Sequence, residues 1–225
     1  MKMKKNAYVF VNDFGHPEDK FIPIVPMIFN YENWHVCIMD SIESISLMAN
    51  APDLIVSFKM GNSDIVDDKP SWYETSAFTY QWMRWVREEG CGLLLIHSGL
   101  PGIPLDHPVM IYGARGYFAG HKSLGPLRVE PVAGLDHPII NGVKEFSVPV
   151  DEHFEIGNFN EDNLVLAYSY SELGGKQPAA WCHEYGKGRV VVLCPGHATP
   201  ENETLRNPEM VKMMQNAVSW CGQEI

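Results

Sequence analysis

Four stretches of the chain are almost continuously apolar, and they constrain the fold more than any other feature of the sequence. They are AYVFV at 7–11, WHVCIM at 34–39, DLIVSF at 53–58 and GLLLI at 92–96. Strands with one solvated side alternate apolar and polar residues, whereas near-continuous apolar runs are typical of a parallel sheet that is covered on both faces. Each run is therefore predicted to be a buried strand of such a sheet.

Helical patterns lie between and after these runs. ETSAFTYQWMRWVREEG places Phe78, Trp82, Trp85 and Val86 on one helical face, and Gly90 is a natural C-terminal stop. The chain closes with a second amphipathic segment, PEMVKMMQNAVSWC. A β-α-β-α series predicts an α/β protein with an open, mostly parallel sheet, right-handed crossovers and helices on both faces.

The second half of the chain has a different pattern. Residues 99–125 hold few strand or helix signals, and so long an irregular insertion in a compact domain is usually functional. Two further strands are predicted, LRVEPV at 127–132 and LVLAYSY at 164–170. AAWCHE and RVVVLCPG flank the turn YGKG, which predicts a C-terminal hairpin.

Composition narrows the class of protein. With 225 residues, 45% of them hydrophobic, the chain is expected to form a single domain, residues 1–225. The formal net charge of −11 argues against a nucleic-acid or membrane partner, and no apolar run is long enough to span a bilayer. The five scattered cysteines fit reduced thiols in a cytoplasm better than a disulfide framework. A homo-oligomer is left open, because the Met- and Trp-rich helices fit pairing and a core equally well.

Polar side chains follow the predicted strands at the edge of the sheet where open α/β proteins bind their ligands. They are Asn12, Asp13 and His16 after the first strand, Lys59 and Asn62 after the third, His97 and Ser98 after the fourth, Arg115, Tyr117 and His121 in the insertion, Asp151, Glu152 and His153 in DEHF, and His197 in PGH. One histidine after a strand is usually an ordinary loop residue. Several that converge by topology indicate a site.

Two chemistries fit such a cluster. Imidazole and carboxylate ligands suit a divalent metal such as Zn or Mn, although no H-E-x-x-H or C-x-x-C spacing is present. Alternatively, histidine serves as a general acid or base, with Glu152 or Asp151 setting its tautomer. No Gly-Lys-Ser/Thr motif is present, so no nucleotide cofactor is expected. His183 alternates within a predicted strand and is expected to face solvent, and Cys194 is expected to be a small buried hydrophobe.

The order of four segments resembles the ThuA family, named for trehalose utilisation. The segments are LLLIHSG, YGARGYFAGH, DHPIINGVKEFSVPVDEHF and PAAWCHEYGKGRVVVLCPGH. This resemblance covers most of the chain and implies a flavodoxin-like fold of the class I glutamine amidotransferase type. It places His97 at the strand-to-turn elbow where an amidotransferase carries its nucleophilic cysteine, so no amidotransferase activity is expected.

The family pattern also carries over to individual residues. It matches His97, His121, Glu152, Trp181 and His197, and His16 corresponds to an early histidine of the family. His153 departs from the pattern, because that position is commonly apolar.

What the resemblance implies is carbohydrate metabolism, next to oxidoreductases that make 3-keto sugars. Our hypothesis is a lyase, isomerase or hydrolase that acts on a keto-sugar or 3-keto-glycoside. The expected residues are His97, Glu152 and His197 for catalysis, His16, Tyr117 and Trp181 for the sugar, and His97, His121, His153 and His197 for a Zn or Mn ion. Two alternatives stay open: a non-catalytic sugar-binding or regulatory module, and a hydrolase that uses Ser98 activated by His197 or His121.

Overall fold

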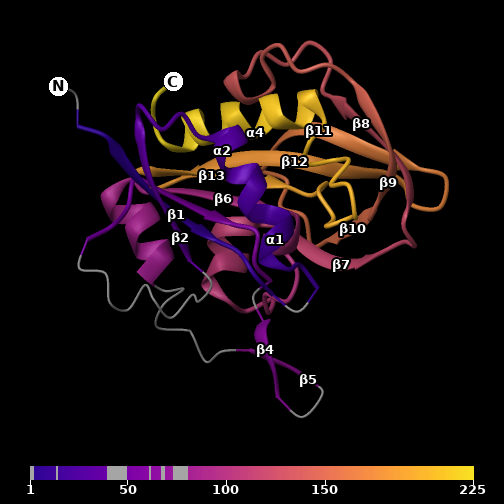
Figure 1. Ribbon diagram of the computed structural model, residues 1–225, viewed down its shortest axis with the longest axis horizontal. Helices are drawn as coiled ribbons and strands as arrows, with labels where there is room; N and C mark the ends of the chain where they lie inside the picture. Colours follow the sequence, from indigo (N-terminus) through magenta and orange to yellow (C-terminus); the bar gives the residue numbers. More distant parts are fainter. Residues whose placement is uncertain (1–2, 14, 40–49, 61, 67–68, 73–80) are drawn as a thin grey trace.

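The chain forms a nine-stranded sheet with helices packed on its two faces (Figure 1). The computed structural model describes residues 3–13, 15–39, 50–60, 62–66, 69–72 and 81–225. Within these residues the strand order is β2-β1-β3-β6-β13-β12-β11-β8-β9. The first five in this order are parallel: β2 (Trp34–Met39), β1 (Lys5–Phe10), β3 (Leu54–Ser57), β6 (Gly92–Ile96) and β13 (Gly188–Leu193). The four apolar runs are thus confirmed as neighbouring parallel strands.

The other half of the sheet is antiparallel, so the predicted parallel arrangement holds for the core half only. The antiparallel strands are β12 (Gly175–Tyr185), β11 (Leu164–Ser171), β8 (Gly125–Pro131) and β9 (Phe146–Asp151). The predicted hairpin is confirmed as β12 and β13. It joins the two halves, because β13 pairs in parallel with β6 on one side and antiparallel with β12 on the other. The result is a mixed sheet with a parallel core half.

Alternate residues of each parallel strand supply the two hydrophobic cores. In β1, Val9 packs in the core under the helices α1 (Glu18–Phe21), α2 (Val25–Ile28) and α4 (Pro208–Cys221), whereas Phe10 packs in the core on the opposite face. That second core is covered by residues 81–89, which end in a π-helix at Trp85–Glu89, and by the π-helix Val109–Ala114. Because successive side chains of a strand point to opposite faces, a strand that is buried on both sides must be apolar throughout. Helices on both faces are therefore confirmed.

The helix predicted before β6 ends as expected. Gly90 has a φ of 84° and serves as the left-handed C-cap, and Trp82, Trp85 and Val86 are buried. The beginning of this predicted helix, including Phe78, lies outside the described residues.

The predicted irregular insertion is partly regular. After the π-helix Val109–Ala114, the strand β7 (Tyr117–His121) pairs antiparallel with β10 (Phe154–Gly157) in a separate two-stranded sheet. The partner strand is more than thirty residues away in the sequence, so local pattern could not reveal this pairing. Another two-stranded sheet, β4 (Asn62–Val66) and β5 (Lys69–Trp72), projects from the body of the molecule (Figure 1).

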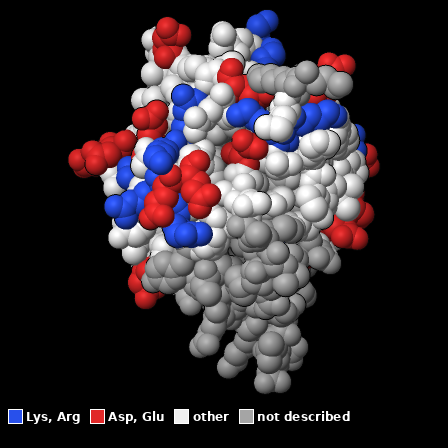
Figure 2. Space-filling model, turned by 90° about the vertical axis from the view of Figure 1, so that its left-hand side faces the viewer, with Lys and Arg blue, Asp and Glu red and all other residues white. Residues whose placement is uncertain are grey.

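The surface carries charges of both signs. On the face shown in Figure 2, Lys and Arg side chains lie among Asp and Glu side chains, which is typical of a solvated surface. Within the described ranges, every helix is too short or too polar to cross a lipid bilayer. All five cysteines lie in the described part of the chain, and none forms a disulfide.

Candidate metal centre

The turn after β6 holds His97 in a sparsely populated backbone conformation. His97 has a φ of 45°, in the left-handed region, and its side chain is completely buried. A Cβ added to Gly99 would lie 2.2 Å from the Ser57 carbonyl oxygen, so the turn packs against β3 only because residue 99 is glycine. The predicted elbow is therefore present, with an imidazole at its tip.

The tautomer of His97 follows from the hydrogen bond of its Nδ1. Its Nδ1 lies 2.8 Å from the carbonyl oxygen of Cys194. A carbonyl oxygen only accepts, so Nδ1 carries a proton, and in the neutral ring Nε2 presents a lone pair. A backbone carbonyl on the outer nitrogen is the arrangement typical of histidines that bind metal.

A carboxylate orients His16 in the same way. The His16 Nδ1 lies 2.8 Å from Asp13 Oδ1, and the Asp13 carboxylate also accepts the backbone N–H groups of Gly15 and Met60. Burial lowers the pKa of His16 more strongly than Asp13 raises it. The neutral imidazole is therefore favoured, with its Nε2 lone pair free to bind a cation.

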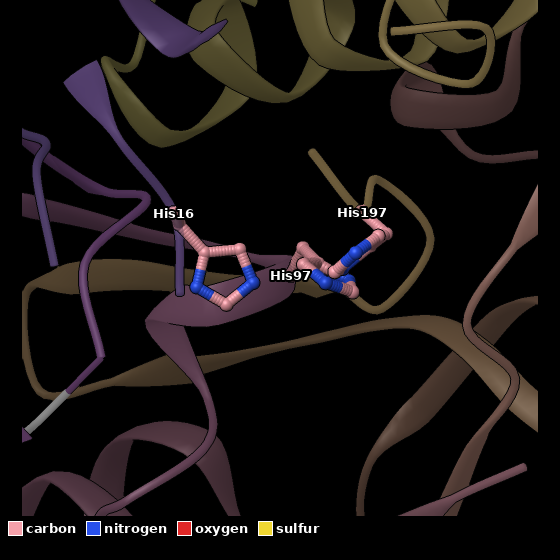
Figure 3. A group of neighbouring side chains, drawn as sticks. All are labelled: His16, His97 and His197. Atoms are coloured by element: carbon pink, nitrogen blue, oxygen red, sulfur yellow. The ribbon is translucent and has the colours of Figure 1, made fainter. Parts of the chain in front are cut away.

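His16, His97 and His197 converge on one point (Figure 3). Their ring centroids are 5.3 to 5.6 Å apart, and one ligand nitrogen from each lies within 4.8 Å of the others. The buried atoms His16 Nε2, His97 Nε2 and His197 Nδ1 have no hydrogen-bond partner. An unsatisfied buried nitrogen is costly, and a divalent cation bound here would satisfy all three at once. These donors therefore fit a metal ion.

Glu152 adds a carboxylate to the three imidazoles. Its Oε2 lies 3.5 Å from His97 Nε2 and its Oε1 lies 3.4 Å from His197 Nδ1, which are ion-pair distances rather than ordinary hydrogen bonds. Burial would raise the pKa of Glu152, but His197 and His97 together outweigh burial and hold that pKa below its usual range. Conversely, the Glu152 carboxylate raises the pKa of His197 despite burial. Glu152 is therefore a charged carboxylate at neutral pH.

Two of the predicted metal ligands are placed elsewhere. The His121 Nε2 lies 3.7 Å from Glu152 Oε1, and its side chain is partly exposed, so it contacts the carboxylate from outside the group of three. Both nitrogens of His153 are engaged by hydroxyl groups, Nδ1 with Ser171 at 2.6 Å and Nε2 with Ser169 at 3.0 Å. Of the four residues predicted as ligands, only His97 and His197 belong to the group, and His16 completes it.

The residues expected to contact a sugar are also separated. Trp181 has no exposed surface, and its indole N–H donates to the Ala114 carbonyl oxygen at 2.7 Å, so neither ring face is open to a ligand. Tyr117 is half-buried at the start of β7, against the second core. The hydroxyl of Ser98 is buried and donates to the Phe58 carbonyl oxygen, which removes the nucleophile of the Ser98 hydrolase hypothesis.

Sequence reasoning missed two neighbours of this centre. Asp13 was named as a polar residue after the first strand but was given no role. Its position three residues before His16 is the sequence signal that could have indicated their contact. Sequence reasoning also missed Phe154, whose ring stacks on His97 with a centroid distance of 4.5 Å. Nothing in the local pattern around Phe154 indicates that contact.

His183 is buried rather than solvent-facing, which corrects our expectation. Its Nε2 lies 3.0 Å from the Tyr112 carbonyl oxygen, and burial lowers its pKa to about 4.

In the unfolded chain His183 has its ordinary pKa near 6.5, so between about pH 6.5 and pH 4 the unfolded state holds more protons than the folded state. Stability from this residue is present above that window and lost as pH falls through it, on the order of 2–3 kcal/mol. Urea unfolding at pH 7 and pH 4.5 should show a smaller loss for His183→Gln than for the wild type; an equal loss would contradict the assignment.

Comparison with known proteins agrees with this structure. The ThuA family, described as trehalose utilisation, matches residues 72–221, which is two thirds of the chain. The chain belongs to the ThuA family. No match was found among curated proteins.

Solved structures show the same fold at low sequence identity. A ThuA-like protein from Parabacteroides merdae ATCC 43184 is 14% identical, with a TM-score of 0.72 over 99% of this chain and 91% of that one. A ThuA-like protein from Bacteroides uniformis ATCC 8492 is 18% identical, with a TM-score of 0.71 over 98% and 93%. A GMP synthase subunit from Thermoplasma acidophilum is 15% identical, with a TM-score of 0.60 over 100% and 97%. The expected glutamine amidotransferase-like fold is confirmed.

The residue at the elbow of this ThuA-family protein is a histidine and not a cysteine. A glutaminase needs a thiolate at the elbow, where this chain has His97. The backbone carbonyl oxygen of Cys194 accepts the hydrogen bond from His97. The thiol of Cys194 is buried, and burial raises its pKa. A thiol held in its protonated form is a poor nucleophile.

Proposed function

We propose that this ThuA-family protein is a metal-dependent enzyme of carbohydrate metabolism that acts on a 3-keto-glycoside. The observation that carries the proposal is the set of three buried ring nitrogens that lack partners and face one point beside the charged Glu152. The family's description as trehalose utilisation supports a sugar as the substrate class.

The donor set favours zinc or manganese. Three imidazole nitrogens with a carboxylate at hand suit either ion, and three protein ligands with one open position are typical of catalytic zinc sites. Such an ion, when bound, polarises a ketone oxygen and stabilises negative charge that develops on it. The Cys194 carbonyl oxygen is bonded to the His97 ring and the Asp13 carboxylate is bonded to the His16 ring. These two hydrogen bonds keep both rings in the orientation that metal binding needs.

The protein's own groups supply the proton transfers. Glu152, ionised and next to His97 and His197, accepts the proton from the carbon beside the ketone as the C–H bond breaks, and the electron pair moves into the enolate. His121 lies on the outer side of the Glu152 carboxylate, where it can give a proton to the departing glycosidic oxygen. The enolate electron pair then forms a C=C double bond and restores the ketone as the C–O bond breaks. The oxygen leaves with the electron pair of that bond and with the proton, which completes an elimination.

The two rival hypotheses lose their supporting features. A sugar-binding module would need the ring of Trp181 open to the ligand, but Trp181 is buried. The serine hydrolase needs a free hydroxyl, but that of Ser98 is bonded to the backbone. We place the proposed enzyme in the cytoplasm, in keeping with its five unpaired cysteines.

Glu152→Gln tests the proposed base. The amide keeps the shape of the side chain but accepts no proton, so turnover of a 3-keto-glycoside should fall by about 10²–10⁴-fold. Zinc should still bind, because the three imidazoles remain. Metal content by plasma emission spectrometry and product formation by chromatography measure the two effects.

The exposed Glu161→Gln is the matched control and should behave as wild type. A wild type that binds neither zinc nor manganese, or a Glu152→Gln enzyme of full activity, would end the proposal.

A further inference from the structure

We propose that Asp151 is a positioning residue that sets Glu152 and His197 together through the backbone. Asp151 is 1% exposed. Its Oδ1 accepts the backbone N–H groups of Glu152 at 2.7 Å and His197 at 2.9 Å, and its Oδ2 accepts that of Gly196 at 3.0 Å. One buried carboxylate thus binds the two residues whose side chains meet 3.4 Å apart at the proposed metal centre. This inference rests on the proposed function.

The sheet alone does not hold these two segments together. Asp151 is the last residue of β9, at the edge of the sheet, whereas Gly196 and His197 follow β13 in the parallel half. The strands β12, β11 and β8 lie between them in the strand order. Among the hydrogen bonds of the described residues, those of the Asp151 carboxylate join the end of β9 directly to the turn that carries His197.

The three donors explain why this position carries a carboxylate. Burying a carboxylate is costly unless it is hydrogen-bonded, and three N–H groups directed at two oxygens satisfy it. An asparagine has one acceptor oxygen and would direct an N–H₂ group at a backbone N–H. Gly196 has a φ of 138°, and a Cβ added there would lie 2.8 Å from a Leu205 methyl group. The absence of a side chain at residue 196 therefore lets its N–H group reach the Asp151 carboxylate. Asp13 differs, because it orients the His16 ring directly.

Asp151→Asn tests the inference in the metal-free protein. Removing the hydrogen-bond partner of a metal ligand typically lowers metal affinity by about 10–100-fold. We expect a loss of that size in the Zn²⁺ affinity of Asp151→Asn, measured by isothermal titration calorimetry. Amide hydrogen exchange at Gly196 and His197, followed by NMR, should accelerate by about tenfold or more, which reports the lost hydrogen bonds without any metal. The exposed Asp136→Asn is the matched control and should change neither quantity.

The outcomes separate this inference from the proposed function. If the wild type binds Zn²⁺ and Asp151→Asn binds it equally well, the positioning role is wrong while the metal centre stands. A wild type that binds neither Zn²⁺ nor Mn²⁺ overturns both. Should Asp151→Asn fail to fold, wild-type exchange is measured with and without Zn²⁺. Slower exchange at Gly196 and His197 on binding supports the inference, and unchanged exchange overturns it.

Discussion

Replacing His97 with alanine is expected to weaken Zn²⁺ binding by on the order of 10²–10³-fold and to reduce turnover with it. Zinc sites with four ligands bind with about 10–16 kcal/mol, so one ligand accounts for roughly 2.5–4 kcal/mol. Among the proposed ligands, His97 is completely buried and its Nδ1 is bonded to the Cys194 carbonyl oxygen. Calorimetry on the metal-free protein and metal content after dialysis measure the loss.

Two further variants make this result interpretable. His35→Ala removes an exposed imidazole from β2 and should leave zinc binding unchanged. His97→Asn keeps a residue type that tolerates the left-handed backbone at φ 45° and removes only the ligand, so it should lose zinc as His97→Ala does. If either His97 variant retains wild-type zinc affinity in a folded protein, the centre does not include this residue.

Trp181→Ala should lower the free energy of unfolding by about 3–5 kcal/mol, the range seen when a large buried aromatic side chain is removed. Trp181 is among the largest fully buried side chains, and its ring packs edge-on against Phe159 at a centroid distance of 5.2 Å. Its removal leaves a cavity and deprives the Ala114 carbonyl oxygen of its donor. Urea unfolding followed by circular dichroism measures the difference.

Trp181→Phe separates a packing role from a sugar-binding role. Phenylalanine restores much of the buried surface but not the N–H group, so the loss of stability should be smaller than for alanine. Affinity for a 3-keto-glycoside, measured per folded molecule, should not change. A variant of normal stability with reduced sugar affinity would show instead that the ring reaches the ligand.

The parallel half of the fold could be predicted because its information is local. The strand at 34–39, the strand at 92–96 and the final helix at 208–221 have the predicted bounds, since apolar runs and helical periodicity are properties of neighbouring residues. The pairing of β7 with β10 is different. It joins Tyr117 to Gly157, and no property of either segment indicates the other.

The candidate site shows the same division. Topology predicted that His97 and His197 follow strands at one edge, and they meet there. Local pattern did not indicate which of three consecutive polar residues, Asp151 to His153, would face the imidazoles, and only the family resemblance singled out Glu152. In the structure Glu152 faces them, whereas His153 bonds Ser169 and Ser171. Glu152 and His153 lie between the end of β9 and the start of β10, so the alternation of side chains along a strand does not assign their directions.

The three imidazoles come from the first, middle and last parts of the chain, at positions 16, 97 and 197. A cation bound by all three would link segments that lie far apart in the unfolded chain. It would therefore bind the folded chain and not separate fragments of the chain. Occupancy would then raise the melting temperature of the entire molecule in proportion to the logarithm of free ion concentration. Chelation would in turn speed proteolysis at peptide bonds that become accessible only on global unfolding, including bonds remote from the ligands.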